Sequence, residues 1–314
     1  MYRYVIKRLL FLIPTILGVT FILYFVMNIA PGNPGRALLG SSALQADVDA
    51  LNHELGYDRP FLVKYVNYIK NMVVHMDFGK SYYTKQPVFD EIWPRYIITI
   101  KLALMGIILA TLIGIPPGIY TAVKQYTLWD TIPSVVAFLI SAIPAFVFGL
   151  LMLFLFSLKL NWLPSFGSAT IWHYIMPTLT VAVLPAAQIM RFTKSSMLES
   201  IRQDYVRTAR AKGAPERRVI IRHALMNALL PVITMIGLSL GVLVCGAVVA
   251  EKMFSIPGIG SLVIDRIVYK DEPIILAGVI LISICFTIVM LIVDITYALI
   301  DPRIKAKYTT IGKD

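Results

Sequence analysis

The stretch LLFLIPTILGVTFILYFVMNI, residues 9–29, decides the fold class because its 21 residues include no charged side chain. A helix crosses the hydrocarbon of a bilayer with about 20 apolar residues. A cleaved signal peptide is the alternative, but its apolar region is usually about 7–15 residues long, and Asn28-Ile29-Ala30 is a poor cleavage site. We therefore expect a retained transmembrane helix.

Five further apolar runs are long enough to cross a membrane. They are residues 102–123, 131–158, 171–190, 228–250 and 273–299. Only helices or closed barrels span lipid, and these runs lack the alternation of a barrel strand. The chain is also 58% hydrophobic and only 15% charged, against about 25% charged in a soluble domain. The sequence predicts an all-α polytopic membrane protein with six transmembrane helices.

The basic residues favour one side of these spans. With a cytoplasmic N-terminus, the inside segments hold 17 Lys and Arg and six acids, whereas the outside segments hold 12 basic residues and 11 acids. This is the positive-inside pattern. The net charge of +11 therefore reflects topology and not nucleic-acid binding, and both termini are predicted to be cytoplasmic.

Residues 31–94 form a predicted extracytoplasmic region after the first span. Within it, Phe61, Tyr65, Ile69 and Met72 recur at helical spacing. Two interpretations stay open: a cap packed over the spans, or a docking surface or lid for a protein that supplies solute.

The loop after the fifth span, EKMFSIPGIGSLVIDRIVYKDEP (251–273), has an unusual composition. Pro257-Gly258 favours a tight turn, and GSLVIDRIVY is apolar enough to return toward the membrane as a short helix. Irregular backbone at membrane depth persists only against protein or a water-filled cavity. Pro257 and Gly258 are therefore candidate gate residues, with a simple connector as the alternative.

Asp294 is the only acid within a predicted span. A charge at the centre of a bilayer costs roughly 2.5–3.5 kcal/mol on insertion scales, although Asp294 lies near the cytoplasmic end. It either pairs with a neighbouring helix or basic loop, or it lines a transport path or couples an ion.

Signatures of chemistry are missing from the sequence. The two cysteines lie in apolar runs, and the four histidines do not have metal-ligand spacing. No GxxxxGK[ST] phosphate loop, HExxH or GxSxG is present. We expect no metal, no cofactor and no enzymatic activity in this chain, so any ATP chemistry must come from another polypeptide.

The segment QDYVRTARAKGAPERRVIIRHALMNALLP (203–231) interrupts the apolar sequence with arginines. Asp204 can cap a helix over Tyr205–Lys212, and Gly213 suits the C′ position. Val206 and Ala209 give this helix a small, smooth face that permits close approach to a partner's groove, with arginines for an acidic rim. The alternative is a basic loop held by anionic lipid.

At these residues the chain resembles a family. DYVRTARAKG followed by RHALMNALLP is similar to the cytoplasmic loop of permease subunits from ATP-driven, binding-protein-dependent (ABC) importers, in the dipeptide/oligopeptide/nickel branch. APGNP, LGYDRP, DFGKS, IPAFVFGLLMLFLFSLKLNWLPSFG, EKMFSIPGIG and DPRIK agree in order along nearly the whole chain. The wider superfamily has an EAA-x3-G loop. Here the matching positions are Arg207-Thr208-Ala209 and Gly213, so the acid is absent, as in the peptide branch.

The resemblance implies a type I importer fold in a bacterial cytoplasmic membrane. Its parts would be an N-terminal segment 1–94, a permease core 95–301 with the coupling loop 191–227, and a cytoplasmic tail 302–314. The partners would be membrane lipid, a second permease subunit in a heterodimer, two cytosolic ATPases that bind ATP and Mg²⁺, and an extracytoplasmic solute-binding protein. The ATPase contacts would be Asp204, Tyr205, Val206, Arg207, Thr208, Ala209, Arg210, Lys212 and Gly213.

The cargo stays open at this point. Di- or oligopeptides, or similar small solutes, are the first expectation, and nickel or a metal chelate is the alternative. An ion-coupled secondary carrier is the alternative of a different class, because such carriers place charged groups within their spans.

Overall fold

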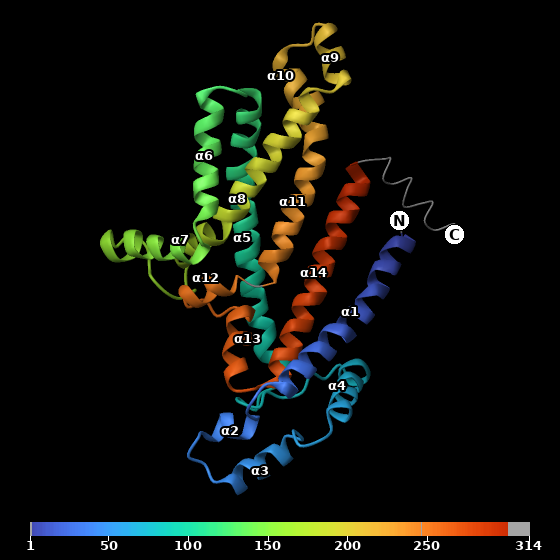
Figure 1. The fold of residues 1–314 in the computed structure, drawn as a ribbon, viewed down its shortest axis with the longest axis vertical. Coiled ribbons are helices and arrows are strands. Elements are labelled where there is room, and N and C mark those ends of the chain that lie inside the picture. The colour runs from blue at the N-terminus through green and yellow to red at the C-terminus, as the bar shows by residue number, and fades with distance from the viewer. Residues whose placement is uncertain (1, 246, 301–314) are drawn as a thin grey trace.

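The computed structural model describes residues 2–245 and 247–300, which are almost entirely helical (Figure 1). The predicted tail 302–314 lies outside the described residues. In chain order the helices are α1 (Tyr2–Ile29), α2 (Pro34–Leu39), α3 (Gln45–Glu54), α4 (Phe61–His75), α5 (Val88–Val123), α6 (Leu128–Ala142), α7 (Ala145–Met152), η1 (Leu153–Lys159), α8 (Trp172–Ile201), α9 (Asp204–Ala211), α10 (Glu216–Arg218), η2 (Val219–Leu225), α11 (Met226–Val244), α12 (Val248–Met253), α13 (Ile259–Val268) and α14 (Glu272–Ile300).

Five helices of the described part have the length and apolar character of a membrane span. They are Leu9–Ile29, Val88–Val123, Trp172–Ile201, Glu216–Val244 and Glu272–Thr296. At about 1.5 Å per residue, the 36 residues of α5 measure about 54 Å. This length exceeds the hydrocarbon core of about 30 Å, so α5 is longer than a straight crossing of the membrane requires.

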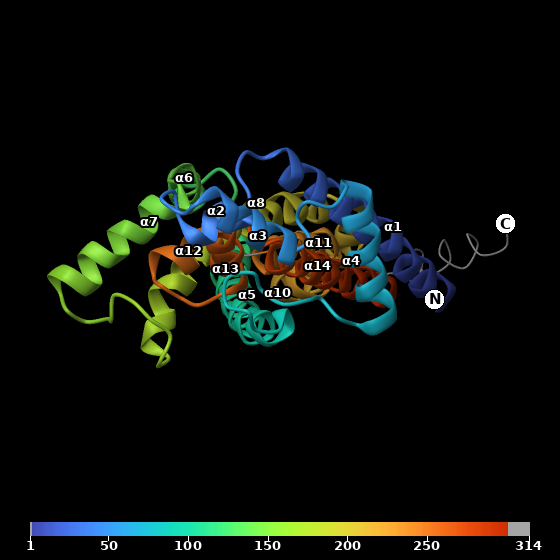
Figure 2. The same cartoon turned by 90° about the horizontal axis from the view of Figure 1, so that it is seen from below.

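The predicted span 131–158 is not one straight helix. It is divided into α6 and α7–η1, whose axes differ by 98°, and the two together count as at most one bent span. The break falls at Ile143 (φ −81°, ψ 123°), which precedes Pro144. A proline ring disfavours helical backbone in the residue before it, which explains the position of the bend. Both views show α7 projecting from the bundle on the side opposite α1 (Figures 1 and 2).

Close contact between α5 and α8 holds the centre of the bundle. An added Cβ at Gly114 would lie 2.8 Å from the Ala186 carbonyl oxygen, and one at Gly118 would lie 2.7 Å from the Met190 carbonyl oxygen. Only glycine permits backbones to approach this closely, as is common between transmembrane helices. The main buried apolar cluster includes residues of α5, α8, α11 and α14.

The two ends of the bundle carry different structures. The short helices α9 and α10 lie at one end, and α2, α3, α4 and α13 lie at the other (Figure 1). The helix expected within residues 31–94 is present as α4, which begins at Phe61 after Pro60. This arrangement separates a basic end from the end where residues 31–94 cover the spans.

Candidate functional site

The short helix α9 is closed by a defined C-terminal motif. The Gly213 N–H donates to the Arg210 carbonyl at 2.9 Å, and the Ala214 N–H donates to the Ala209 carbonyl at 3.2 Å. Gly213 has φ +77°, as predicted for a C′ glycine, and these two bonds form a Schellman motif. The N-terminus differs from the prediction, because Gln203 holds the N-cap position and Asp204 is the first helical residue. The exposed Asp204 carboxylate lies in the first turn of α9, where the positive end of the helix dipole stabilises a negative charge.

The small face of α9 packs within the chain itself. Val206 is fully buried and Ala209 is 9% exposed. Their buried cluster also contains Ala122, Met197, Val219, Ile220, Ala224 and Ala228. The expectation that Val206 and Ala209 enter a partner's groove is therefore wrong. A helix this short has marginal stability in isolation. It buries its apolar face against the nearest apolar surface, which belongs to α8 and η2.

A chain of hydrogen bonds fixes the start of α9. The Ser200 hydroxyl donates to the Ala224 carbonyl at 2.8 Å and lies 2.8 Å from the Tyr205 hydroxyl. Because the single Ser200 proton is used on Ala224, the Tyr205 hydroxyl donates to Ser200. Three elements, α8, α9 and η2, are thereby joined at one point.

The far end of α9 is fixed by an ion pair across the turn at Gly213. Arg210 Nη2 lies 2.7 Å from Glu216 Oε1, and Arg210 Nε lies 3.1 Å from Glu216 Oε2. This paired geometry orients both side chains. It also occupies Arg210, which the resemblance had assigned to a partner.

The outward face of α9 consists of the remaining side chains. Tyr205, Arg207, Thr208, Lys212 and Gly213 are exposed. The Arg207 side chain is 78% exposed and its nearest acid is Asp204 at 3.9 Å. Further exposed arginines surround this face at positions 202, 217, 218 and 222. The structure thus presents a rigid, cationic platform at this end of the bundle.

A groove between α8 and α11 leads away from the platform. It contains two cavities of about 410 Å³ each, and both are lined by Gln188 and Met235. The cavity nearer the platform also has Arg191 and Ser195 in its wall. Polar groups along an otherwise apolar groove are suited to a path for polar solute.

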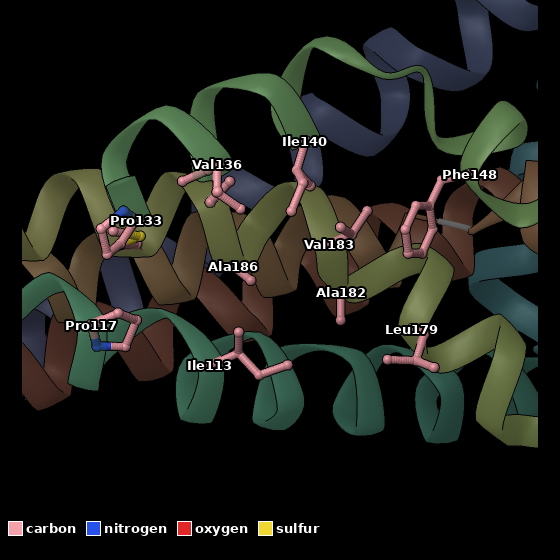
Figure 3. A pocket seen from close by; sticks show the side chains of 13 residues that line it. Ile113, Pro117, Pro133, Val136, Ile140, Phe148, Leu179, Ala182, Val183 and Ala186 are labelled. Atoms are coloured by element: carbon pink, nitrogen blue, oxygen red, sulfur yellow. The ribbon is translucent and has the colours of Figure 1, made fainter. Parts of the chain in front are cut away.

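A separate cavity of about 270 Å³ lies between α5, α6 and α8 and is lined by apolar side chains throughout. Figure 3 shows Pro117 and Pro133 at one end and Phe148 of α7 at the other. Because this cavity offers no polar side chain to a solute, the α8–α11 groove is the better candidate for the path.

The predicted gate residues Pro257 and Gly258 lie beside a buried carboxylate. Glu251 is fully buried; its Oε1 accepts from the Thr99 hydroxyl at 2.5 Å, and its Oε2 accepts from the Ser261 N–H at 2.8 Å. Thr99 in turn accepts the Ile259 N–H at 2.9 Å. Glu251 therefore caps the first turn of α13, and α13 is the short helix expected after Pro257-Gly258.

Burial raises the pKa of the Glu251 carboxyl, while the bonds from Thr99, Ser261 and Gly260 oppose that shift. A Cβ at Gly258 would overlap the carboxylate. The glycine at position 258 is thus explained by the buried Glu251 carboxylate, which occupies the space beside the turn and bonds to the first turn of α13.

Asp294, the other candidate, is half-buried on α14. Its neighbour Val293 packs against Gly237 of α11, whereas the groove is bounded by α8 and α11. The structure does not bring Asp294 together with Pro257 and Gly258.

Sequence reasoning missed several residues that the structure singles out. Gln188 is one polar residue in an apolar run, and Thr99 has no local signal. Asp130 is buried and is paired with Lys194 across α6 and α8. The signal that was available for this pair is an acid and a base at the same end of two adjacent spans.

Comparison with known proteins agrees with this architecture. Residues 114–306 match the family described as "Binding-protein-dependent transport system inner membrane component", and residues 1–103 match its N-terminal family, "Binding-prot-dependent transport system membrane comp, N-term". The chain is 39% identical to the glutathione transport system permease protein GsiC of Escherichia coli (strain K12) over 307 residues, which cover 98% of this chain and 100% of the relative.

The GsiC protein of Salmonella choleraesuis (strain SC-B67) is 40% identical over the same lengths. Full-length coverage with several apolar spanning helices makes this a multi-pass inner-membrane protein. The chain therefore belongs to the binding-protein-dependent transport system inner membrane component family and is a permease subunit of an ABC importer.

Proposed function

We propose that this permease imports di- or oligopeptides and is driven by cytosolic ATPase subunits that dock on the α9 platform. The platform carries the proposal, because its outward face is cationic while its inward face is packed on the chain's own spans. In this assignment the α9 end is cytoplasmic, both termini are cytoplasmic, and the residues 31–94 face the solute-binding protein.

The contacts of α9 explain how a docked partner would transmit force. The bonds among Tyr205, Ser200 and Ala224 tie α9 to α8 and η2, and the pair Arg210–Glu216 ties it to α10. Since α8 packs on α5 and η2 continues into α11, displacement of α9 moves the helices that border the groove. The groove would then form one half of the path, with the second permease subunit supplying the other half.

Peptide cargo is supported by the relatives, because GsiC is named as a permease for glutathione. The Gln188, Arg191 and Ser195 side chains of the groove offer hydrogen bonds to amide and carboxylate groups. ATP hydrolysis is assigned to the partner subunits.

The test reverses the charge of one exposed platform residue. In the assembled transporter in nanodiscs, Arg207→Glu is expected to weaken ATPase binding by about tenfold, which equals about 1.4 kcal/mol, and to abolish peptide-stimulated ATP hydrolysis. The matched control is Lys124→Glu, an exposed cation on the α5–α6 connection. If Arg207→Glu and Lys124→Glu behave alike, α9 is not the docking element.

A further inference from the structure

A polar pocket at the opposite end of the molecule is not explained by the platform or the groove. Its volume is about 220 Å³, equivalent to about seven water molecules at their liquid volume. It forms where α1, α3, α4 and α14 meet, at the lower end of the bundle in Figure 1. The lining residues are Tyr24, Glu54, Leu55, Gly56, Arg59, Lys64, Asn67, Tyr68, Tyr82 and Glu272.

Two polar groups of α4 line this pocket without using their hydrogen-bonding capacity. Lys64 is only 9% exposed, and neither its ammonium nor the Tyr68 hydroxyl has a hydrogen-bond partner within the part of the chain that the structure describes. The Lys64 ammonium lies 4.1 Å from the centre of the Tyr57 ring, a cation–π contact that supplies no oxygen acceptor. Buried ammonium groups are strongly disfavoured unless an acceptor or an anion reaches them.

The pocket is also lined by a buried acid. Glu272 at the start of α14 is 2% exposed, and Lys64 and Lys270 are the cations near it. Lys270 is already engaged, because its ammonium donates to the Ala30 and Gly32 carbonyls at 2.5 and 2.6 Å. The pocket is therefore lined by an ammonium group that has no hydrogen-bond acceptor in the described part of the chain, and by a buried carboxylate.

Tyr82 brings an adjoining loop to the wall of the pocket. The adjoining loop is anchored by the Tyr82 N–H, which donates to Asp271 at 2.9 Å, and by the Ser81 hydroxyl, which donates to the same carboxylate. Arg59 and Glu54 also line the pocket and are exposed. The opening of the pocket thus carries one cation and one acid, as its interior does.

We propose that this pocket binds a small zwitterion, an amino acid or a dipeptide with both termini free. The ligand's ammonium pairs with Glu272, and its carboxylate accepts from Lys64 and Tyr68. The Lys64 ammonium and the Tyr68 hydroxyl then gain the hydrogen-bond acceptor that they lack, and charge-assisted hydrogen bonds of this kind are among the strongest in proteins. A bound ligand joins α4 of the extracytoplasmic region to the first turn of α14, away from the α8–α11 groove. The inference rests on the proposed function for the source of the ligand, and on the pocket alone for its chemistry.

The experiment is a calorimetric titration of the assembled transporter in nanodiscs, without ATP and without the solute-binding protein. The probes are glycylglycine, N-acetylglycylglycine, glycylglycinamide and the doubly blocked dipeptide. We expect glycylglycine to bind at least tenfold more tightly than each singly blocked probe, and the doubly blocked probe to show no binding. No heat with any probe, or equal binding of glycylglycine and the doubly blocked probe, overturns the proposal.

Variants locate the site. Lys64→Met and Glu272→Gln are expected to abolish binding, and Tyr68→Phe, which removes only a hydroxyl, is expected to weaken it several-fold. Lys70→Met, an exposed lysine on the same helix, is the control and keeps wild-type affinity. Unchanged affinity in the Lys64 and Glu272 variants overturns the site.

A second readout covers the case in which a variant fails to fold. In the wild-type transporter, glycylglycine is expected to slow amide hydrogen exchange in α4 and in the first turn of α14, and exchange that is unchanged in both contradicts the site. Because neither readout depends on ATP, failure of the platform test leaves this result standing, and failure here leaves ATPase docking untouched.

Discussion

The Thr99 hydroxyl donates to Glu251 Oε1 at 2.5 Å, although the two residues are 152 positions apart in the chain. This bond joins α5 to the turn before α13. The second oxygen of this buried carboxylate accepts a hydrogen bond from the Ser261 N–H. The orientation of α13 therefore depends on one acid.

Replacement of Glu251 by Gln is expected to lower the free energy of unfolding by about 1–3 kcal/mol. A glutamine amide has one acceptor oxygen in place of two, so at least one buried donor is left without a partner. Thermal unfolding of the purified chain in detergent measures the change. Asp265→Asn is the control, since its pair with Lys252 is largely exposed and should contribute under about 1 kcal/mol. Equal shifts in the two variants would contradict the capping role.

Gly213→Asn and Gly213→Asp separate backbone strain from charge at the end of α9. An added Cβ meets open space there, so the backbone effect comes from φ +77° alone, which asparagine tolerates better than most residues. We expect Gly213→Asn to retain most peptide-stimulated ATP hydrolysis and Gly213→Asp to lose most of it, because the docking partner is expected to be acidic. Identical activity of the two variants would show that the partner does not sense charge at this position.

Enlargement of Gly114 tests the contact between α5 and α8. In Gly114→Ala, the new methyl group meets the Ala186 carbonyl at 2.8 Å and the Ile189 side chain at 2.9 Å, and backbone cannot move aside cheaply. We expect a loss of about 1–3 kcal/mol, measured as a lower unfolding temperature. Gly18→Ala on α1, where nothing lies within 4 Å, should leave that temperature unchanged.

The hydroxyl chain at the start of α9 can be measured by a double-mutant cycle. Tyr205→Phe and Ser200→Ala each remove one side of the bond between them, and each is expected to cost about 0.5–1.5 kcal/mol of stability. Because they share this bond, the double variant should cost less than the sum of the two. Strict additivity would mean that the hydroxyls do not interact in the membrane-bound protein.

Hydropathy predicted most of the membrane architecture, because the bilayer selects for length and apolarity, which can be read locally. It did not predict the direction of the chain at Ile143. The signal was present, since Pro144 follows Ile143, but an apolar run continues through both residues and hydropathy does not register a bend. The start of α5 at Val88 was also not predicted. Charged residues such as Asp90 and Arg95 interrupt the apolar run, so hydropathy places the beginning of the span at residue 102.

The candidate site was predictable to a smaller extent. The position and C-terminal cap of α9 follow from Gly213 and its neighbours, which act locally. Whether Val206 faces a partner or its own chain depends on Met197 and Val219, which lie on other elements, and a local pattern cannot decide between them. The same is true of Glu251, whose partner Thr99 is supplied by the fold.

The elements α10, η2 and α11 are continuous, so a movement at the platform is carried to the opposite end of the bundle. Residues Glu216–Val244 form one helical rod of 29 residues, about 40 Å long at the usual rise. A tilt of about 5° at the platform therefore sweeps the far tip through roughly 3–4 Å, about the width of a water molecule. Under the proposed docking, a small displacement of the platform by an ATPase subunit is therefore enough to open or close a passage at the opposite end of this rod.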